Sequence, residues 1–286
     1  MFKLRLITAL ILIPVIIIAL FSLSMIEFSI AILAISVLAA WEWSSLARLS
    51  SYLRRIIFTI SCGMVLLGCM LDLLYNMQDG RHSLHFSKFL WIALCWWIIV
   101  IPLVYYYPKS AIVWRNSCIL RVLFGFFTIF SFFYGMLSIR QYNYVIDHNT
   151  GVWQLFYFLM LVWGADSGAY VFGKLFGNYK LAPQLSSGKT WEGLIGGLFV
   201  SCSMVYLFSA LSLTSIPCMP LLFYSLIVVL ASVLGDLSES MFKREAAVKD
   251  SGKILPGHGG ILDRIDSLAA AAPVFASLQW LICGVF

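Results

Sequence analysis

Charged residues are scarce in this sequence of 286 residues. Asp, Glu, Lys and Arg make up only 11% of it and hydrophobic residues 62%, whereas soluble domains carry about 25% charged residues. A soluble fold of this length could not bury so much apolar surface, so lipid must be the solvent for much of the chain. The composition therefore excludes an ordinary soluble domain. The net charge of +6 is modest, and no nucleic-acid partner is expected.

Several common signals are also missing. None of the seven cysteines belongs to a CxxC pair, so neither a disulfide framework nor a zinc site is expected. The apolar run after Arg5 reaches about Met25 without a convincing small-residue cleavage site, which favours a retained first span over a signal peptide. The sequence has no fixed-period repeat or long linker. We expect one membrane domain over residues 1–286, with N-terminal helices in 1–150 and a candidate catalytic half in 151–286.

Apolar stretches long enough to cross a bilayer predict an all-α, polytopic membrane protein with about nine transmembrane helices. These stretches are residues 6–25, 28–47, 56–75, 88–107, 119–139, 152–173, 191–213, 220–237 and 266–285. With the N-terminus in the cytoplasm, only Arg81, Lys88 and Arg140 of the nineteen basic residues fall in outside loops. Under the positive-inside rule this bias predicts a cytoplasmic N-terminus and a C-terminus outside.

The first polar cluster follows the eighth apolar stretch. Asp236, Glu239, Ser240 and Lys243 are spaced to share one helical face. An Asp at mid-membrane costs roughly 2.5–3.5 kcal/mol on insertion scales, so such a residue usually faces a polar cavity or a partner. The alternative is a helix end that simply emerges into water. We favour the cavity for Asp236.

The second cluster lies between this helix and the last apolar stretch. Gly259 and Gly260 would let the backbone approach phosphate oxygens closely, and His258 beside them is a candidate phosphate contact. Asp263 and Asp266 lie one turn apart, and hard carboxylates suit Mg²⁺, which binds through one or two carboxylates plus substrate phosphates. The residues that flank these acids are Lys243, Arg244, Lys249, Asp250, Lys253 and Arg264. Acids for a metal and bases for phosphates are what a pyrophosphate leaving group requires. A solvated loop with ordinary ion pairs is the alternative.

Two further clusters precede these. Asp166 and Ser167 lie inside an otherwise apolar span, where a polar helix–helix contact is the plain alternative to a ligand site. The sequence Gly188-Lys189-Thr190 resembles the end of a P-loop, but that motif requires Gly at position 183, which is Pro. No parallel-sheet unit precedes it, so the P-loop is rejected. Glu42 and Asp72 are assigned no role.

Together these segments resemble the phosphatidate cytidylyltransferase family, the CDP-diacylglycerol synthases. The matching elements are Ser240-x-x-Lys243-Arg244, Lys249-Asp250, Pro256-x-His258-Gly259-Gly260, Asp263-Arg264-x-Asp266, Asp166-Ser167-x-Ala169-Tyr170 and Lys189-Thr190-x-Glu192-Gly193. The resemblance covers about residues 160–267. It departs from the family at Gly188, where Pro is usual, and this puts the rigidity of that loop in question.

The resemblance implies transfer of CMP from CTP to phosphatidic acid with Mg²⁺. By residue-level similarity, Asp236 and Asp263 hold the metal, and Lys243 and Arg264 complete the catalytic set. Substrate binding is assigned to Asp166, Ser167, Lys189, Thr190, Glu192, Glu239, Ser240, Arg244, Lys249, Asp250, His258, Gly259, Gly260 and Asp266. A second cation and a homodimer are left open. The default location is a bacterial inner membrane, where basic cytoplasmic loops would meet anionic lipid.

Two other functions remain as alternatives. Intramembrane acids also mark the ion pathways of secondary transporters. A transporter predicts acids through the depth of the bilayer, but here they gather beside one face. A membrane CTP-dependent lipid kinase is the second alternative, and it would release CDP rather than pyrophosphate.

Overall fold

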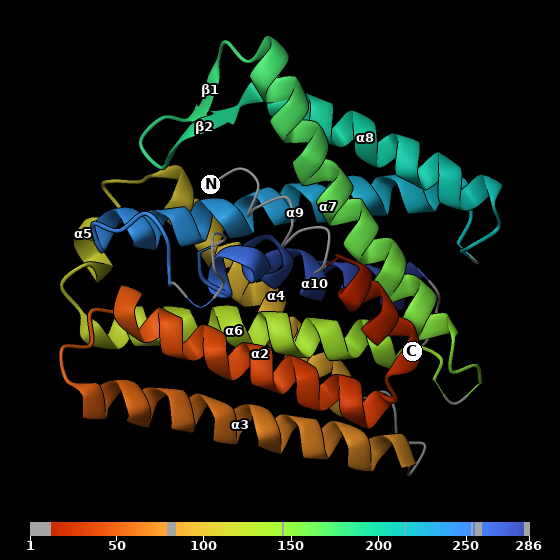
Figure 1. Ribbon diagram of the computed structural model, residues 1–286, viewed down its shortest axis with the longest axis horizontal. Coiled ribbons are helices and arrows are strands. Elements are labelled where there is room, and N and C mark those ends of the chain that lie inside the picture. Colours follow the sequence, from red (N-terminus) through yellow and green to blue (C-terminus); the bar gives the residue numbers. More distant parts are fainter. Residues whose placement is uncertain are drawn as a thin grey trace.

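The chain folds into a bundle of long helices, seen in a computed structural model that describes residues 13–78, 84–144, 146–214, 216–252, 254 and 259–282. A short helix at Ile13–Ser22 precedes the labelled elements. The helices are α2 (Met25–Leu46), α3 (Tyr52–Gln78), α4 (Leu84–Tyr105), α5 (Ala111–Trp114), α6 (Cys118–Gln141), α7 (Thr150–Phe176), α8 (Trp191–Ala210), α9 (Cys218–Glu245) and α10 (Leu262–Ile282). The strands β1 (Lys180–Ala182) and β2 (Ser186–Thr190) pair antiparallel and project from the bundle beside α7 and α8 (Figure 1).

The expectation of an all-α multi-pass membrane protein is confirmed. Within the described residues, seven helices are long and apolar enough to span a membrane: α2, α3, α4, α6, α7, α8 and α9. The helix expected near the C-terminus is present as α10, but it is not among these seven, and the first expected span begins outside the described residues. The count of nine and the orientation of the termini stay predictions.

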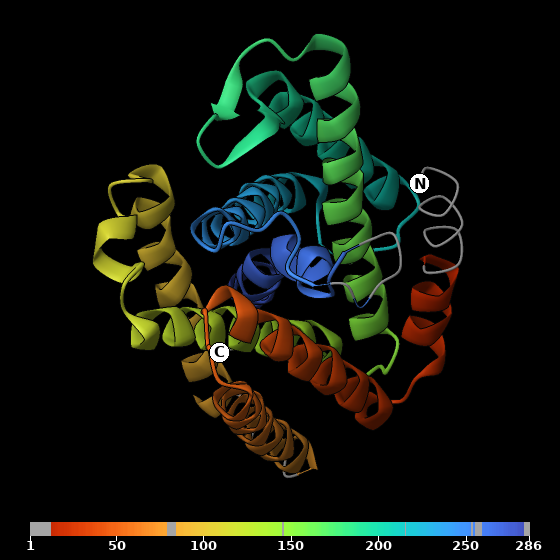
Figure 2. The same ribbon diagram turned by 60° about the vertical axis from the view of Figure 1, so that its left-hand side comes forward.

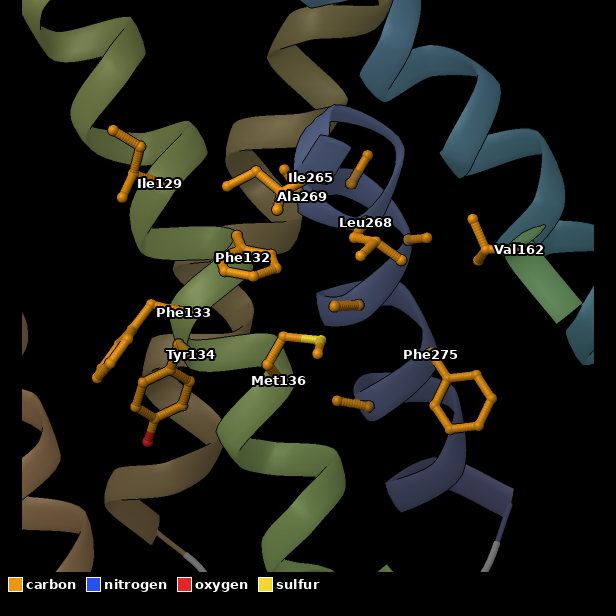
Figure 3. Packing of buried hydrophobic residues seen from close by; sticks show 14 of the residues in the cluster. Ile129, Phe132, Phe133, Tyr134, Met136, Val162, Ile265, Leu268, Ala269 and Phe275 are labelled. Carbon is orange, nitrogen blue, oxygen red and sulfur yellow. The ribbon is translucent and has the colours of Figure 1, made fainter. Parts of the chain in front are cut away.

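Helix α6 lies at the centre of the bundle, and 78% of its most apolar 18-residue stretch is buried. It packs against α2, α4 and α10, and α10 packs in turn against α9. Phe132 and Met136 of α6 point toward α10, where Leu268 and Phe275 belong to the same buried cluster (Figure 3). Small residues on α10, among them Ala272, keep the two backbones close. The polar N-terminal turn of α10 is thereby fixed relative to the rest of the bundle.

The close approach of α6 and α10 yields a stability prediction. A Cβ atom at Gly135 would lie 2.6 Å from the backbone nitrogen of Pro273 and 2.8 Å from Cβ of Ala272. Since backbone cannot yield as a flexible side chain can, Gly135→Ala should destabilise the fold by roughly 1–3 kcal/mol. Thermal unfolding in detergent would show a lowered midpoint. Gly68→Ala is the matched control because nothing lies within 4 Å of its added Cβ atom. Equal unfolding midpoints for the two variants would contradict the close packing of α6 against α10 at Gly135.

Contacts between distant segments define two ends of the bundle. At one end, Leu262 at the start of α10 donates to Glu42 near the end of α2, and Arg48 after α2 donates to the carbonyl of Glu245 at the end of α9. At the other end, Arg140 donates to the carbonyl of Leu23. Residues from loops expected inside and outside therefore lie at opposite ends, as the alternation of basic residues requires.

Two local features differ from the sequence expectation. Residues 174–190, expected to be a loop, include the hairpin of β1 and β2, which stands far from α3 in both views (Figures 1 and 2). The eighth expected span ends at 237, but α9 continues to Glu245. The extension carries the polar residues Glu239, Ser240 and Lys243, and Lys243 bonds to Asp263 of α10. The loop expected at 238–265 therefore shortens to 246–261.

Candidate active site

Buried aromatic rings fix the end of α9 that carries the polar residues. Phe242 is fully buried, with its ring centroid 4.9 Å from that of Trp43, 4.4 Å from Trp114 and 4.7 Å from Phe124. The Trp43 indole also donates to the carbonyl of Arg121 at 2.9 Å. Aromatic packing of this kind leaves α9 little freedom to rotate. The adjoining face, which carries Glu239 and Lys243, is thus held toward α10.

Lys243 joins two carboxylates on different helices. Its Nζ lies 2.8 Å from Oε2 of Glu239 and 2.8 Å from Oδ1 of Asp263. The three side chains are mostly buried, with exposed fractions of 13% for Lys243, 3% for Glu239 and 9% for Asp263. The Lys243–Glu239 pair confirms the expected helical face, because the two residues are one turn apart on α9.

Asp263 also accepts hydrogen bonds from the backbone of the preceding loop. The amide of Gly260 donates to Oδ2 at 2.8 Å, and the amide of Ser251 lies 3.0 Å from the same oxygen. Burial alone would raise the pKa of this carboxyl, but the hydrogen bond and charge of Lys243, with the two amides, outweigh it and lower the pKa. Asp263 is therefore a carboxylate at neutral pH.

A second ion pair joins α9 to the hairpin. Nζ of Lys189 on β2 lies 2.5 Å from Oδ2 of Asp236, and the exposed fractions are 23% and 31%. The hydroxyl of Ser240 points to the other carboxylate oxygen of Asp236 at 3.4 Å. This pair is more open to solvent than the one around Lys243.

The other polar residues of the Lys189-Thr190-x-Glu192 segment bond to nearby backbone amides. Thr190 caps α8, with Oγ1 accepting from the amide of Gly193 at 3.1 Å, and it is buried. The carboxylate of Glu192 accepts from the amides of Asn178 and Tyr179, each at 3.1 Å. Local backbone contacts thus engage both residues that sequence analysis assigned to substrate.

Arg244 ties the hairpin to α9. Its Nε donates to the carbonyl of Leu185 in the turn between β1 and β2 at 2.9 Å, and Leu185 itself is buried. Two contacts therefore hold the hairpin against α9. They are the hydrogen bond from Arg244 to the turn and the ion pair between Lys189 on β2 and Asp236.

Asp166 and Asp266 extend the acid cluster toward α7. Asp166 interacts electrostatically with Lys189, Asp236 and Asp266, and its carboxylate accepts a hydrogen bond from the Ser267 hydroxyl. Asp266 interacts with Glu239. Helices α7, α9 and α10 thus bring five carboxylates together with two lysines.

The remaining predicted residues lie at the margin of this cluster. Ser167, Lys249, Asp250 and Arg264 are exposed. Gly259 has a φ of +84°, and a Cβ atom there would lie 2.9 Å from Oδ2 of Asp263, so only glycine fits this turn without strain. Lys253, Pro256 and His258 lie outside the described residues.

Sequence reasoning missed Glu42, a residue of α2 that is only 3% exposed. Its Oε2 accepts from the amide of Leu262 at 2.8 Å and lies 3.2 Å from the Ser251 hydroxyl. An acidic residue inside an apolar span was a usable signal, but its partner lies 220 positions away in the chain. Local pattern could not identify that partner.

Comparison with known proteins identifies the class to which this site belongs. Residues 3–282 match the model of the cytidylyltransferase family, and the chain belongs to that family. Among its relatives are the phosphatidate cytidylyltransferases of Haemophilus influenzae, 40% identical over 99% of this chain and 100% of that protein, and of Pseudomonas aeruginosa, 38% identical over 98% and 97%. A third, from Bacillus subtilis, is 40% identical over 52% of this chain and 55% of its own length.

Proposed function

We propose that the protein transfers CMP from CTP to phosphatidic acid, giving CDP-diacylglycerol and pyrophosphate. Relatives named phosphatidate cytidylyltransferase that align over nearly the whole chain support this reaction. The observation that carries the site assignment is the convergence of acids and lysines from α7, α9, α10 and the hairpin at one end of a membrane bundle. A water-soluble nucleotide and a lipid headgroup can meet at such an end.

The donor set fits a hard divalent cation. Five acidic side chains gather with two lysines, and their oxygen atoms are ligands that suit Mg²⁺. No group of three or more His, Cys, Asp or Glu side chains able to hold a metal forms within the described part of the chain. Mg²⁺ usually binds through one or two carboxylates and is completed by substrate phosphates. Asp236 and Asp263 would hold it, and the bound ion would neutralise charge on the triphosphate.

The reaction needs no protein nucleophile. A phosphatidate oxygen attacks the α-phosphorus of CTP, a new P–O bond forms, and the bond from the α-phosphorus to the bridging oxygen breaks to release pyrophosphate. Lys189 and Lys243 supply positive charge to the phosphates. Their pairing with Asp236 and Asp263 holds both ammonium groups in place before substrate arrives.

The position in the membrane follows from the same site. CTP is a cytoplasmic nucleotide, so the end of the bundle with Asp236 and Asp263 would face the cytoplasm, as the basic loops predict. Because the relatives are bacterial proteins, the location we propose is the inner membrane.

The reaction is tested by following two labels. Purified protein in mixed micelles with phosphatidic acid and Mg²⁺ receives CTP labelled at either the α- or the γ-phosphate. We expect α-label in the lipid with an equal amount of pyrophosphate, and no γ-label in the lipid. Reactions without phosphatidic acid are the control. Label from the γ-phosphate in lipid, with release of CDP, would instead identify a kinase and refute the proposal. Coupled solute uptake in proteoliposomes without CTP turnover would favour a transporter.

A further inference from the structure

Glu42 links the N-terminal half of the chain to the loop that carries the acid cluster. Its Oε2 accepts the amide of Leu262, the first residue of α10, at 2.8 Å. That amide has no partner within its own helix, and a carboxylate is favoured at a helix N-terminus. The Ser251 hydroxyl lies 3.2 Å from the same oxygen. Glu42 therefore contacts the segment between α9 and α10 at Ser251 and the start of α10 at Leu262.

The loop is also shaped around this carboxylate. A Cβ atom at Gly252 would lie 2.1 Å from Oε1 of Glu42, and one at Gly260 would lie 2.4 Å from Oε2. A side chain at Gly252 or at Gly260 would therefore clash with the Glu42 carboxylate. Its Oε1 is buried and has no hydrogen-bond partner among the described residues. A buried carboxylate costs free energy unless its contacts compensate.

The same two loop segments hold Asp263. Ser251 donates its amide to Asp263 and its hydroxyl to Glu42. Gly260 donates to Asp263, while Leu262, two residues later, donates to Glu42. The loop is thus held between two carboxylates, one from α10 and one from α2.

We infer that Glu42 is a positioning residue for the reaction, which fixes the Ser251 and Gly260–Leu262 segments and thereby the place of the Asp263 carboxylate. This inference rests on the proposed function. Glu42 touches neither Lys243 nor Asp263 in the contacts above, so it acts through the loop rather than on substrate. Because misplacement of a reacting group by 1 Å can cost about 10²-fold in rate, loss of this contact should lower kcat markedly.

Hydrogen exchange gives a readout that does not depend on turnover. In Glu42→Ala, peptides containing Ser251, Gly260 and Leu262 should exchange faster than in the wild type, with kcat lower by about 10²-fold. Glu42→Gln keeps an acceptor for both donors, so its exchange and kcat should lie closer to the wild type. Glu27→Gln is the control, because Glu27 lies at the opposite end of α2, where its carboxylate accepts from the amide of Ser24.

A double-mutant cycle tests the contact itself. Gly252→Ala should slow turnover in the wild type because its methyl group displaces the Glu42 carboxylate, but add little in the Glu42→Ala background. If Glu42→Ala does not fold, exchange in Gly252→Ala and Glu42→Gln carries the test. Unchanged exchange at these peptides in folded Glu42→Ala or folded Gly252→Ala, or additive effects of the two substitutions, would overturn the inference. If the wild type makes no CDP-diacylglycerol, the proposed function fails, whereas the exchange comparison still decides whether Glu42 holds the loop.

Discussion

Asp263→Asn should reduce CDP-diacylglycerol formation by roughly 10³-fold or more, equivalent to about 4 kcal/mol of transition-state stabilisation. Among the described residues, the hydrogen-bond partners of the Asp263 carboxylate are donors: the ammonium of Lys243 and the amides of Ser251 and Gly260. An asparagine amide would place its own NH₂ group against at least one of them. It would also remove a charged oxygen from the proposed Mg²⁺ site.

The control for this variant is Asp147→Asn. Asp147 is likewise hydrogen-bonded, to the amide of Asn149 at 3.0 Å and the hydroxyl of Thr150 at 2.8 Å, but it lies before α7, at the other end of the bundle. Its turnover should match the wild type. Both variants are assayed with α-labelled CTP after their elution as monodisperse protein is checked. Near wild-type turnover by folded Asp263→Asn would show that Asp263 is not a metal ligand.

Lys243→Met should destabilise the protein and abolish turnover together. Lys243 lies 2.8 Å from both Glu239 and Asp263, so its loss leaves two mostly buried carboxylates without their shared counter-charge. Removing one partner of a buried ion pair costs about 3–5 kcal/mol. Thermal unfolding in detergent would report the loss of stability and the label assay the loss of activity.

Two comparisons separate charge from position at Lys243. Lys243→Arg keeps the charge but presents a planar fork instead of a compact ammonium, so it should recover stability more than turnover. Lys109→Met removes an exposed lysine and should change neither. A melting midpoint for Lys243→Met equal to that of the wild type would mean that the ion-pair network does not stabilise the fold.

The parts of the structure that sequence predicted are those set by local pattern. Hydropathy located the helices because each span must be apolar over about 20 residues. Helical spacing placed Glu239 and Lys243 on one face, and the Lys243–Glu239 pair bears this out. Residue-level similarity to the family assigned Asp236 and Asp263 to the metal, and the structure joins each of them to a lysine.

The parts that sequence missed depend on contacts between distant segments. Hydropathy ended the eighth span at 237, whereas helical spacing already carried the helix as far as Lys243. What the sequence could not show is the packing of Phe242 against rings of other helices, which holds this polar extension in place. The spacing within Lys189-Thr190-x-Glu192 does not show that the three residues have different roles. Lys189 pairs with Asp236, Thr190 caps α8, and Glu192 accepts hydrogen bonds from the backbone before β1. Glu42 could not be assigned, because the donors that define its role come from the other half of the chain.

The central claim is that the carboxylates of α9 and α10 form the metal and nucleotide site, and Mn²⁺ binding tests it most directly. Mn²⁺ takes the same oxygen ligands as Mg²⁺, and its electron paramagnetic resonance signal reports binding without turnover. With a CTP analogue that cannot release pyrophosphate, we expect saturable Mn²⁺ binding to the wild type and its loss in both Asp236→Asn and Asp263→Asn. Wild-type Mn²⁺ affinity in both folded variants would contradict the account and place the metal elsewhere.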